Sequence, residues 1–161
     1  MSVSNRGFTF IEIIVVVGIL ATITGMAVAN LSGFQRKSYL SAQLQTITAD
    51  IKSQQLKAMN GDTGGSSAHN AFGVHFSTNG YRLFHGASYN AAEPSNAFVA
   101  LDGNIVIADV TFPGSQVVFA SGSGELGSYT AGSASFTLRN TIDGAEKTVT
   151  INRYGAITSI N

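Results

Sequence analysis

The stretch of sequence that decides the fold lies near the N-terminus and reads, from Arg6 to Gln35, RGFTFIEIIVVVGILATITGMAVANLSGFQ. It contains 23 consecutive residues without a charged side chain, from Ile13 to Gln35. As a helix rising about 1.5 Å per residue, this run is roughly 35 Å long, enough to cross a hydrocarbon core of roughly 30 Å. A buried core helix seldom runs so long without one charge. The stretch therefore predicts a membrane-spanning helix.

The composition of the whole chain limits the kinds of domain and site that it can form. The chain has 161 residues, of which 9 are basic, 9 are acidic and none is Cys. That length suits one domain with a single core. A formal net charge of zero provides no global field to hold nucleic acid or an anionic membrane. The lack of Cys excludes disulfides, Cys-based zinc sites and thiol nucleophiles.

Glu12 stands at the front edge of the apolar run. A carboxylate in lipid costs at least a few kcal/mol, so intramembrane acids usually have a partner or a task. The residues three and four positions away on either side are uncharged, so no cation lies within helical reach. The partner of Glu12 is expected to come from another chain, or from an amine that the encoded sequence does not show.

An ordinary secretory signal peptide is the alternative interpretation of the same stretch. Ala27-Val28-Ala29 fits the small-x-small cleavage rule, and Arg6 supplies a positive segment before the apolar run. Against this interpretation, the apolar stretch is longer than the usual length of roughly 7 to 15 residues and begins with Glu12. Cleavage after Ala29 would release a secreted β-domain that begins at Asn30.

The segment from Arg6 to Val17 resembles the class III signal of type IV prepilins and type II secretion pseudopilins. The resemblance implies that a prepilin peptidase cuts after Gly7 and methylates the new N-terminal residue, Phe8. It also implies that Glu12 pairs with the methylated amine of a neighbouring subunit entering the filament. Such pairing would let both charges leave water together.

A helical period continues beyond the apolar run. Apolar residues recur at spacings of 4, 3 and 4 from Leu40 to Ile51, the pattern of an amphipathic helix with one buried stripe. Charged residues and several Gln fall on the remaining faces. Asn60-Gly61 supplies a stop signal, so the sequence predicts one helix from Phe8 to Met59.

After a flexible linker the period becomes two, and eight segments rich in Val, Ile, Phe and Thr predict strands. They are residues 72–77, 81–85, 97–101, 104–112, 116–120, 134–142, 145–152 and 156–160. A long helix followed by a run of strands predicts an α+β fold. The family resemblance adds that the β-domain is an antiparallel pair of sheets packed on the helix.

Two dipeptides predict tight hairpins with two-residue loops. A loop at Asp143-Gly144 pairs Phe136 with Ile151 and Leu138 with Val149, and a loop at Asn79-Gly80 pairs Phe76 with Leu83 and Val74 with His85. The first register gathers apolar residues on one face. The second puts His75 and His85 on opposite faces, where they cannot share a metal ion.

No motif in the chain favours an enzyme, and no cofactor or metal is predicted. The Gly-rich stretches lack a following Lys-Ser/Thr and do not open a helix, as a phosphate loop requires. No nucleophile motif surrounds any Ser. The chain is therefore interpreted as a structural subunit.

The C-terminal half resembles the minor pilins and minor pseudopilins of the GspH/FimT group. This similarity rests on the segments 117–124, 135–138 and 147–157. Some members of that group bind DNA through basic residues near the C-terminus. Here the last eight residues contain no Lys or Arg, which argues against DNA as a partner. A major pilin and a DNA-uptake minor pilin stay open as alternatives within the family.

The resemblance implies an organisation, a location and a set of partners. The parts are a leader at 1–7, a transmembrane and filament-core helix at 8–35, and a pilin globular domain at 36–161 formed by helix 36–59 and β-domain 70–161. The implied location is the cytoplasmic (inner) membrane, crossed once with the globular domain outside, and later a pilus or pseudopilus. The implied partners are other pilins or pseudopilins, the prepilin peptidase, an assembly-platform membrane protein and membrane lipid. Orientation rests on the resemblance alone, because Arg6 on one side is matched by Arg36 and Lys37 on the other.

Overall fold

A computed structural model describes residues 7–65 and 67–161, apart from the side chains of 28–38. The chain divides into two compact units, Met1–Ser38 and Tyr39–Asn161. Residues 1–6 of the predicted leader lie outside the described residues, as do the side chains of Ala29, Arg36 and Lys37.

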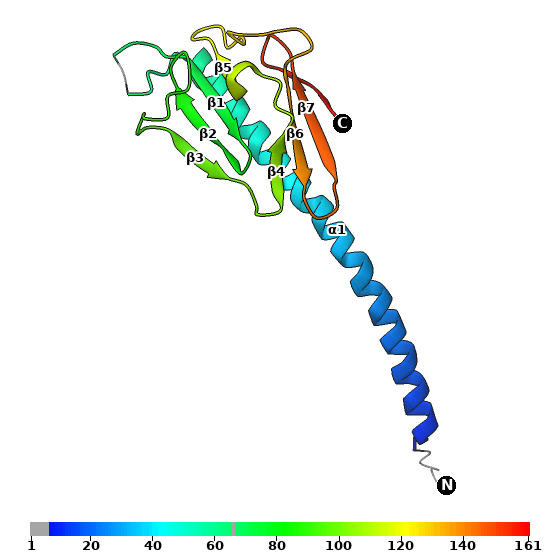
Figure 1. Cartoon of the computed structure of the whole chain (residues 1–161). Helices are drawn as coiled ribbons and strands as arrows, with labels where there is room; N and C mark the ends of the chain where they lie inside the picture. The colour runs from blue at the N-terminus through cyan, green and yellow to red at the C-terminus, as the bar shows by residue number, and fades with distance from the viewer. Residues whose placement is uncertain (1–6, 66) are drawn as a thin grey trace. The chain divides into compact units, whose positions relative to one another are not determined.

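The fold is α+β, as predicted (Figure 1). Its elements are the helix α1 (Phe10–Met59), the strands β1 (Phe72–Ser77), β2 (Gly80–His85), β3 (Ala97–Ala100) and β4 (Ile105–Ala108), the 3₁₀ turn η1 (Pro113–Ser115), and the strands β5 (Gln116–Phe119), β6 (Ser135–Asn140), β7 (Glu146–Ile151) and β8 (Ile157–Ile160). The predicted strand 104–112 is too long, because Asp109 adopts a positive φ of 49° that ends β4.

The end of α1 is where the sequence predicted it. Gly61 adopts a left-handed φ of 68°. This turn lets the Asp62 N–H donate to the Lys57 carbonyl at 3.0 Å and the Gly61 N–H donate to the Ala58 carbonyl at 3.3 Å. Both bonds satisfy carbonyls that have no partner inside the helix. The predicted start at Phe8 is wrong by two residues, since α1 begins at Phe10.

The strands form two antiparallel sheets of four strands each. One has the order β3-β2-β1-β5 and the other the order β4-β6-β7-β8. Two carbonyls in the β1–β2 turn tie the first sheet to β4 of the second sheet and to the residue just after β3. Thr78 accepts from the Ile107 N–H at 2.9 Å, and Asn79 accepts from the Leu101 N–H at 3.1 Å.

These two bonds explain why the predicted register of the first hairpin is wrong by two residues. The loop is Thr78-Asn79, and Phe76 pairs with Tyr81 instead of Leu83. Gly80 belongs to β2, where a Cβ would collide with the Val99 carbonyl of β3. Its lack of a side chain therefore serves strand packing and not the turn. A shift of two preserves the faces, so His75 and His85 still project to opposite sides.

The register of the β6–β7 hairpin is also displaced by two residues. Phe136 pairs with Val149, and the loop spans residues 141–144 instead of Asp143-Gly144 alone. The Asn140 side chain accounts for the longer loop, because its Oδ1 accepts from the Ile142 N–H at 2.9 Å. Such a side-chain bond to the backbone two residues later is a common way for Asn to start a turn.

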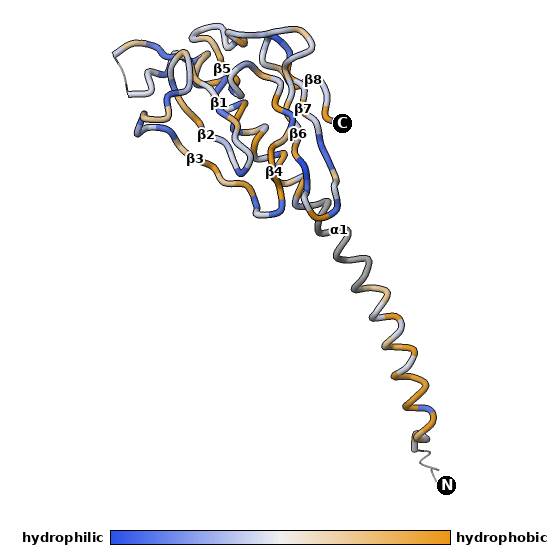
Figure 2. The backbone as a smooth tube through the Cα atoms, in the orientation of Figure 1, coloured by the Kyte–Doolittle hydropathy of each residue, from blue (hydrophilic) through white to orange (hydrophobic). Residues whose placement is uncertain are grey.

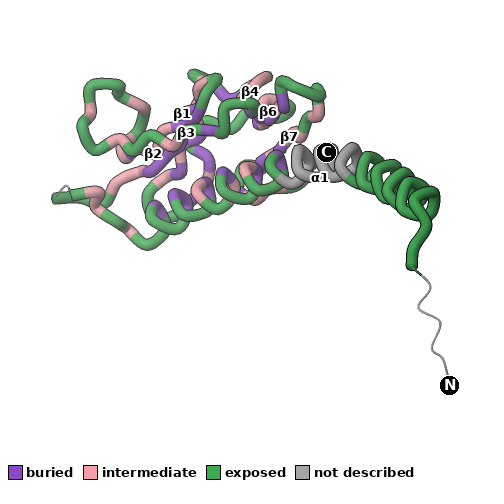
Figure 3. Tube along the Cα trace, turned by 90° about the horizontal axis from the view of Figure 1, so that it is seen from below, coloured by how far each residue is buried: buried purple, intermediate pink, exposed green. Residues whose placement is uncertain are grey.

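The core of the Tyr39–Asn161 unit lies between the second half of α1 and both sheets. The predicted stripe is confirmed, since four apolar helix residues are buried (Figure 3). They are Leu40, Leu44, Ile47 and Ile51. They join one cluster with residues of both sheets, including Phe76, Phe119 and Phe136. The stripe then continues through Gln54, Gln55 and Ala58, although the sequence placed the Gln residues on the polar faces.

The buried Gln55 fastens the end of α1 to two distant loops. Its Nε2 donates to the Gly124 carbonyl at 3.0 Å and to the Tyr154 carbonyl at 2.7 Å. Gly122 adds a bond from its N–H to the Ala58 carbonyl at 2.8 Å. Together these contacts satisfy polar groups that would otherwise be buried without partners.

Asp50 is a second residue that the sequence assigned to a polar face. Its Oδ2 accepts a 2.5 Å hydrogen bond from the hydroxyl of Tyr81, a fully buried residue on β2. Burial raises the pKa of Tyr81 well above its ordinary value, and the bond to Asp50 raises the pKa further. This bond therefore connects α1 to the first sheet only while Tyr81 holds its proton.

We expect the stability of the protein to fall above about pH 10 for this reason. Below that pH, Tyr81 is protonated in both the folded and the unfolded state. Above it the unfolded state loses the proton while the folded state keeps it. The free energy of unfolding should therefore fall by about 1.4 kcal/mol per pH unit. Urea titrations between about pH 9 and pH 11.5 would measure this slope.

The variant Tyr81→Phe should lose this alkaline slope. Tyr154→Phe is the matched control, because Tyr154 is exposed and should leave the slope unchanged. An equal slope in the wild type and in Tyr81→Phe would contradict the assignment.

Candidate processing and membrane-anchoring site

The predicted cleavage site lies in an open, non-helical segment. Gly7, Phe8 and Thr9 precede α1, and all three are exposed. Phe8 is 82% exposed, and nothing in the described structure lies within 4 Å of where a Cβ of Gly7 would stand. A protease binds an extended backbone, so a peptide bond just outside a helix is in a form that it can bind.

Thr9 and Glu12 together begin α1. The Glu12 N–H donates to Thr9 Oγ1 at 3.3 Å, and the Thr9 N–H donates to Glu12 Oε2 at 3.4 Å. This reciprocal pair is a capping box, which satisfies two donors that a helix N-terminus leaves free. Thr9 was not predicted to have this role, although Thr-x-x-Glu before an apolar run is the sequence signal for it. Glu12 therefore has a role within its own chain.

The capping box does not neutralise the charge of Glu12. Among the described residues, Glu12 takes part in no ion pair. Phe8, Glu12, Ile13, Val16 and Val17 line one shallow cavity of about 250 Å³. The structure thus brings Phe8 and Glu12, the two residues that the sequence singled out, to one hollow with an apolar wall. A cation that entered this hollow would contact the carboxylate beside apolar surface, where charge attraction is stronger than in water.

The first part of α1 is long and apolar enough to cross a membrane. The span is Phe10–Ala27, and much of this part of α1 is coloured as hydrophobic in Figure 2. None of its residues is buried by the rest of the chain. Its large side chains are therefore free to contact lipid or other helices. A core helix of a soluble protein would bury much of this surface within its own fold.

Two Thr residues make this span less apolar, but the hydroxyl groups of both form hydrogen bonds to backbone carbonyls of the same helix. Thr22 donates its hydroxyl to the Ile19 carbonyl at 2.8 Å, and Thr24 donates to the Leu20 carbonyl at 2.7 Å. In hydrocarbon an unpaired hydroxyl would cost several kcal/mol. Because both hydroxyls are paired, the second half of the span can enter lipid at a much smaller cost.

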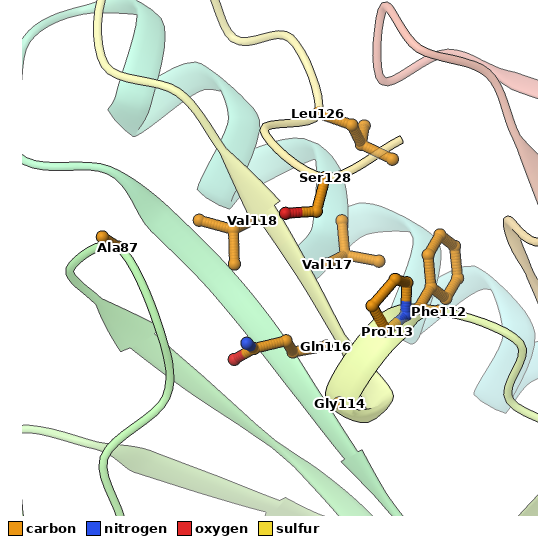
Figure 4. A pocket seen from close by; sticks show the side chains of 9 residues that line it. All are labelled: Ala87, Phe112, Pro113, Gly114, Gln116, Val117, Val118, Leu126 and Ser128. Carbon is orange, nitrogen blue, oxygen red and sulfur yellow. The ribbon is translucent and has the colours of Figure 1, made fainter. Parts of the chain in front are cut away.

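A separate cavity of about 220 Å³ lies beside β5 in the other unit (Figure 4). Its walls include Phe112, Pro113, Val117 and Leu126, and its polar side chains are Gln116 and Ser128. No acid, base or cation lines it. A Ser without a neighbouring base is not an activated nucleophile, so this lining does not form an acyl-transfer site.

The three His residues do not meet at a metal site in the described part of the chain. Within residues 7–65 and 67–161 there is no group of three or more His, Asp and Glu side chains that could hold a metal ion. His75 stacks on Tyr89 with ring centroids 4.1 Å apart. Its burial, and then the nearby Arg82, lower the pKa of His75. A neutral imidazole stacked on an aromatic ring is a packing element.

Two of the three basic residues from residue 139 onward, Arg139 and Arg153, lie beside carboxylates. Arg139 hydrogen-bonds to Glu146 and lies 3.3 Å from Asp109. Arg153 lies 3.6 Å from Glu125. These carboxylates offset the positive charge of the two arginines, which would otherwise attract DNA phosphates.

Comparison with known proteins identifies the N-terminal segment. Residues 3–28 match the family model described as the prokaryotic N-terminal methylation motif. No curated protein and no solved structure matches the chain. The match covers the methylation motif and the start of the apolar helix, which together make a class III prepilin signal, and it does not extend into the β-domain.

Proposed function

We propose that this chain is a structural subunit of a type IV pilus or of a type II secretion pseudopilus. The methylation motif supports a pilin-like protein that a prepilin peptidase processes and that assembles with other pilins. The observation that carries the proposal is the pairing of that motif with an apolar helix of which no side chain in Phe10–Ala27 is buried within the chain. Such a surface requires lipid before assembly and neighbouring helices after it.

In this proposal residues 1–7 are the leader, and the peptidase cuts between Gly7 and Phe8 and methylates the Phe8 amine. Residues 8–35 then anchor the subunit in the cytoplasmic membrane, and residues 36–161 form the globular domain outside it. The helix crosses once, because Phe10–Ala27 is the one candidate span within the described part of the chain.

Entry into the filament is proposed to depend on Glu12. The mature N-terminus creates a cation, and Glu12 is a carboxylate with no ion-pair partner among the described residues. A Phe8 amine of one subunit and the Glu12 of the next would neutralise each other in an apolar surrounding. Helix packing drives the assembly, and the ion pair sets the register between neighbours.

The N-terminus of the mature protein tests the proposal directly. We expect sequencing or mass spectrometry of the protein from membranes to find Phe8 at the N-terminus, carrying a methyl group. An N-terminus at Asn30 would instead establish the secreted β-domain released by ordinary signal peptidase. Co-expression with and without a prepilin peptidase is the control, because cleavage after Gly7 should require that enzyme.

We further propose a minor subunit of the GspH/FimT type. The support is the similarity of the three C-terminal segments and the two-sheet β-domain on the helix. The abundance of the chain in sheared filaments distinguishes a minor subunit from a major pilin. A chain that makes up most of the filament mass would contradict the minor role.

A further inference from the structure

The strand β3 is an outer edge of the first sheet (Figure 1). In the described part of the chain it pairs with β2 on one side and with no strand on the other. Its four residues, Ala97–Ala100, carry no charge, and three of them are exposed. An uncharged, exposed strand edge is a template for pairing with another strand.

The other three sheet edges are covered or irregular. At β5 the Gly127 N–H donates to the Val118 carbonyl at 3.0 Å, so a later segment covers the edge. At β4 the Ile107 N–H donates to the Thr78 carbonyl at 2.9 Å. The pairing of β8 with β7 contains a register shift, which adds local twist to that edge. Covering and twisting both hinder strand pairing, and neither feature is present at β3 in the described structure.

The free backbone groups of this edge belong to Phe98 and Ala100. The Leu101 N–H donates to the Asn79 carbonyl at 3.1 Å and thereby continues the ladder between β3 and β2. Backbone groups alternate in direction along a strand, so those of Val99 also point toward β2, and those of Phe98 and Ala100 point away. The edge therefore presents two N–H donors and two carbonyl acceptors.

The order of side chains makes β3 complementary to itself. When two copies pair antiparallel about Val99, each Phe98 lies opposite the Ala100 of the other copy, and the two Val99 residues lie opposite each other. A large ring then meets a methyl group on the same face of the sheet, without crowding. The register also joins Phe98 to Ala100 by two N–H···O bonds at each end, four in all.

A register centred on Phe98 is less favourable. It would place the two rings opposite each other and would require the Asn96 N–H as a donor. That N–H already donates to the Glu93 carbonyl at 3.3 Å. The free groups of the edge therefore select the register about Val99.

The Phe98 ring is positioned by its own sheet and still open to a partner. Two of its carbons lie 2.8 Å from where a Cβ of Gly80 would stand, and its centroid is 4.7 Å from the Arg82 guanidinium carbon. The residue is nevertheless 51% exposed. The Arg82 side chains of two paired copies would start three strand spacings apart, roughly 14 Å, which exceeds the Debye length of about 8 Å. Their repulsion therefore does not oppose the contact.

We propose that β3 is a self-association edge, through which two copies of this chain pair antiparallel along residues 97–100. The pair joins the two first sheets into one continuous sheet, with four strands from each copy. It is an isologous contact, because the same residues face each other across a two-fold axis. The inference does not depend on the N-terminal signal and goes beyond the proposed function.

The two-fold axis fixes how the two copies meet. It runs perpendicular to the paired sheets, and residues 39–59 of α1 pack against those sheets. The two copies of this helical segment therefore run in opposite directions. Neighbouring subunits of the proposed filament have helices that run the same way, so the β3 contact joins free subunits or subunits of two filaments.

The register can be tested with single thiols, because the chain contains no Cys. In the full chain in detergent micelles, Val99→Cys should give a disulfide-linked dimer under mild oxidation. The two Cα atoms would be about 4.5 Å apart, within the disulfide range of roughly 4.4 to 6.8 Å. Ala97→Cys is the matched control, since Ala97 is more exposed than Val99 but would lie roughly 14 Å from its own copy. We expect at least a tenfold higher yield of dimer from Val99→Cys.

The hydrogen bonds can be tested separately by Ala100→Pro. Proline removes an N–H that points away from β2, so the ladder between β2 and β3 keeps its bonds. In sedimentation equilibrium the wild type should dimerise, and Ala100→Pro should weaken the association at least about tenfold, because two of the four bonds are lost. Ala100→Ser keeps the N–H and a small side chain and should associate like the wild type.

Several results would overturn the inference. These are equal dimer yields from Val99→Cys and Ala97→Cys, unchanged association of a folded Ala100→Pro, and a wild type that sediments as a monomer while Val99→Cys gives no dimer. Dimers formed through the N-terminal helices would not distinguish these variants and would therefore contradict a β3 contact. Thermal unfolding confirms that each variant is folded, and the two cysteine variants decide the question if Ala100→Pro is not.

Discussion

Replacing Gly155 by alanine should destabilise the globular unit by about 3 kcal/mol. Gly155 has a φ of 75°, where a non-glycine residue costs roughly 1 to 2 kcal/mol. A Cβ there would also collide with the Gln55 amide and stand 2.8 Å from the Phe119 ring. Crowding of a packed site adds roughly 1 to 3 kcal/mol, because neither neighbour can move away freely. The free energy of unfolding from urea titrations measures the loss.

Gly144→Ala is the matched control for this prediction. Gly144 has nearly the same φ, 70°, but nothing lies within 4 Å of where its Cβ would stand. It should therefore show the backbone cost alone, about 1 kcal/mol. If both variants lost the same stability, the contact between Gly155 and Gln55 would have no importance for the fold.

If Glu12 pairs with the Phe8 amine of a neighbouring subunit, as proposed, Glu12→Gln should reduce incorporation into filaments at least a hundredfold and leave cleavage after Gly7 unchanged. Removing one partner of a buried ion pair leaves the other charge unpaired, at a cost of roughly 3 to 5 kcal/mol. Each 1.4 kcal/mol corresponds to about a factor of ten in an equilibrium. The ratio of the chain in sheared filaments to the chain in membranes measures the effect.

The capping box makes Glu12→Gln a cleaner test than Glu12→Ala. Glutamine can still accept the Thr9 N–H, so the start of α1 is preserved while the charge is removed. Thr9→Ala makes the converse change, because it weakens the cap by about 1 kcal/mol and keeps the carboxylate. We expect Thr9→Ala to retain most incorporation. Equal losses in Thr9→Ala and Glu12→Gln would assign the effect to the helix start and not to the charge.

The helix and the strands could be predicted from the sequence because their signals are local. The apolar run, the stripe from Leu40 to Ile51 and the Asn60-Gly61 stop each depend on residues close together in the chain. The structure confirms α1 to within two residues at its start and all eight strands, with changed ends. The side of the sheet to which each side chain points was also predictable, because apolar and polar residues alternate along a strand and this pattern depends only on the strand's own residues.

The hairpin registers could not be predicted in the same way. Both are displaced by two residues, which preserves the faces and therefore leaves the hydrophobic pattern unchanged. In the β1–β2 hairpin, hydrogen bonds from residues outside the hairpin select the register. In the β6–β7 hairpin, a hydrogen bond from the backbone to an Asn side chain selects it. Ile107 and Leu101 use the turn carbonyls of Thr78 and Asn79, and Asn140 holds the longer loop.

The N-terminal signal was determined by the sequence alone, because its chemistry depends on consecutive residues. Gly7, Phe8 and Glu12 stand in a fixed order, and residues 3–28 match the methylation motif. The contacts at the end of α1 were decided only by the tertiary structure. Gln55 reaches Gly124 and Tyr154, and Gln54 and Lys57 meet His85 at one cavity, across separations of about 30 to 100 residues. The local sequence pattern places a Gln on a polar face of the helix. That face becomes part of the protein interior only because distant loops pack against it.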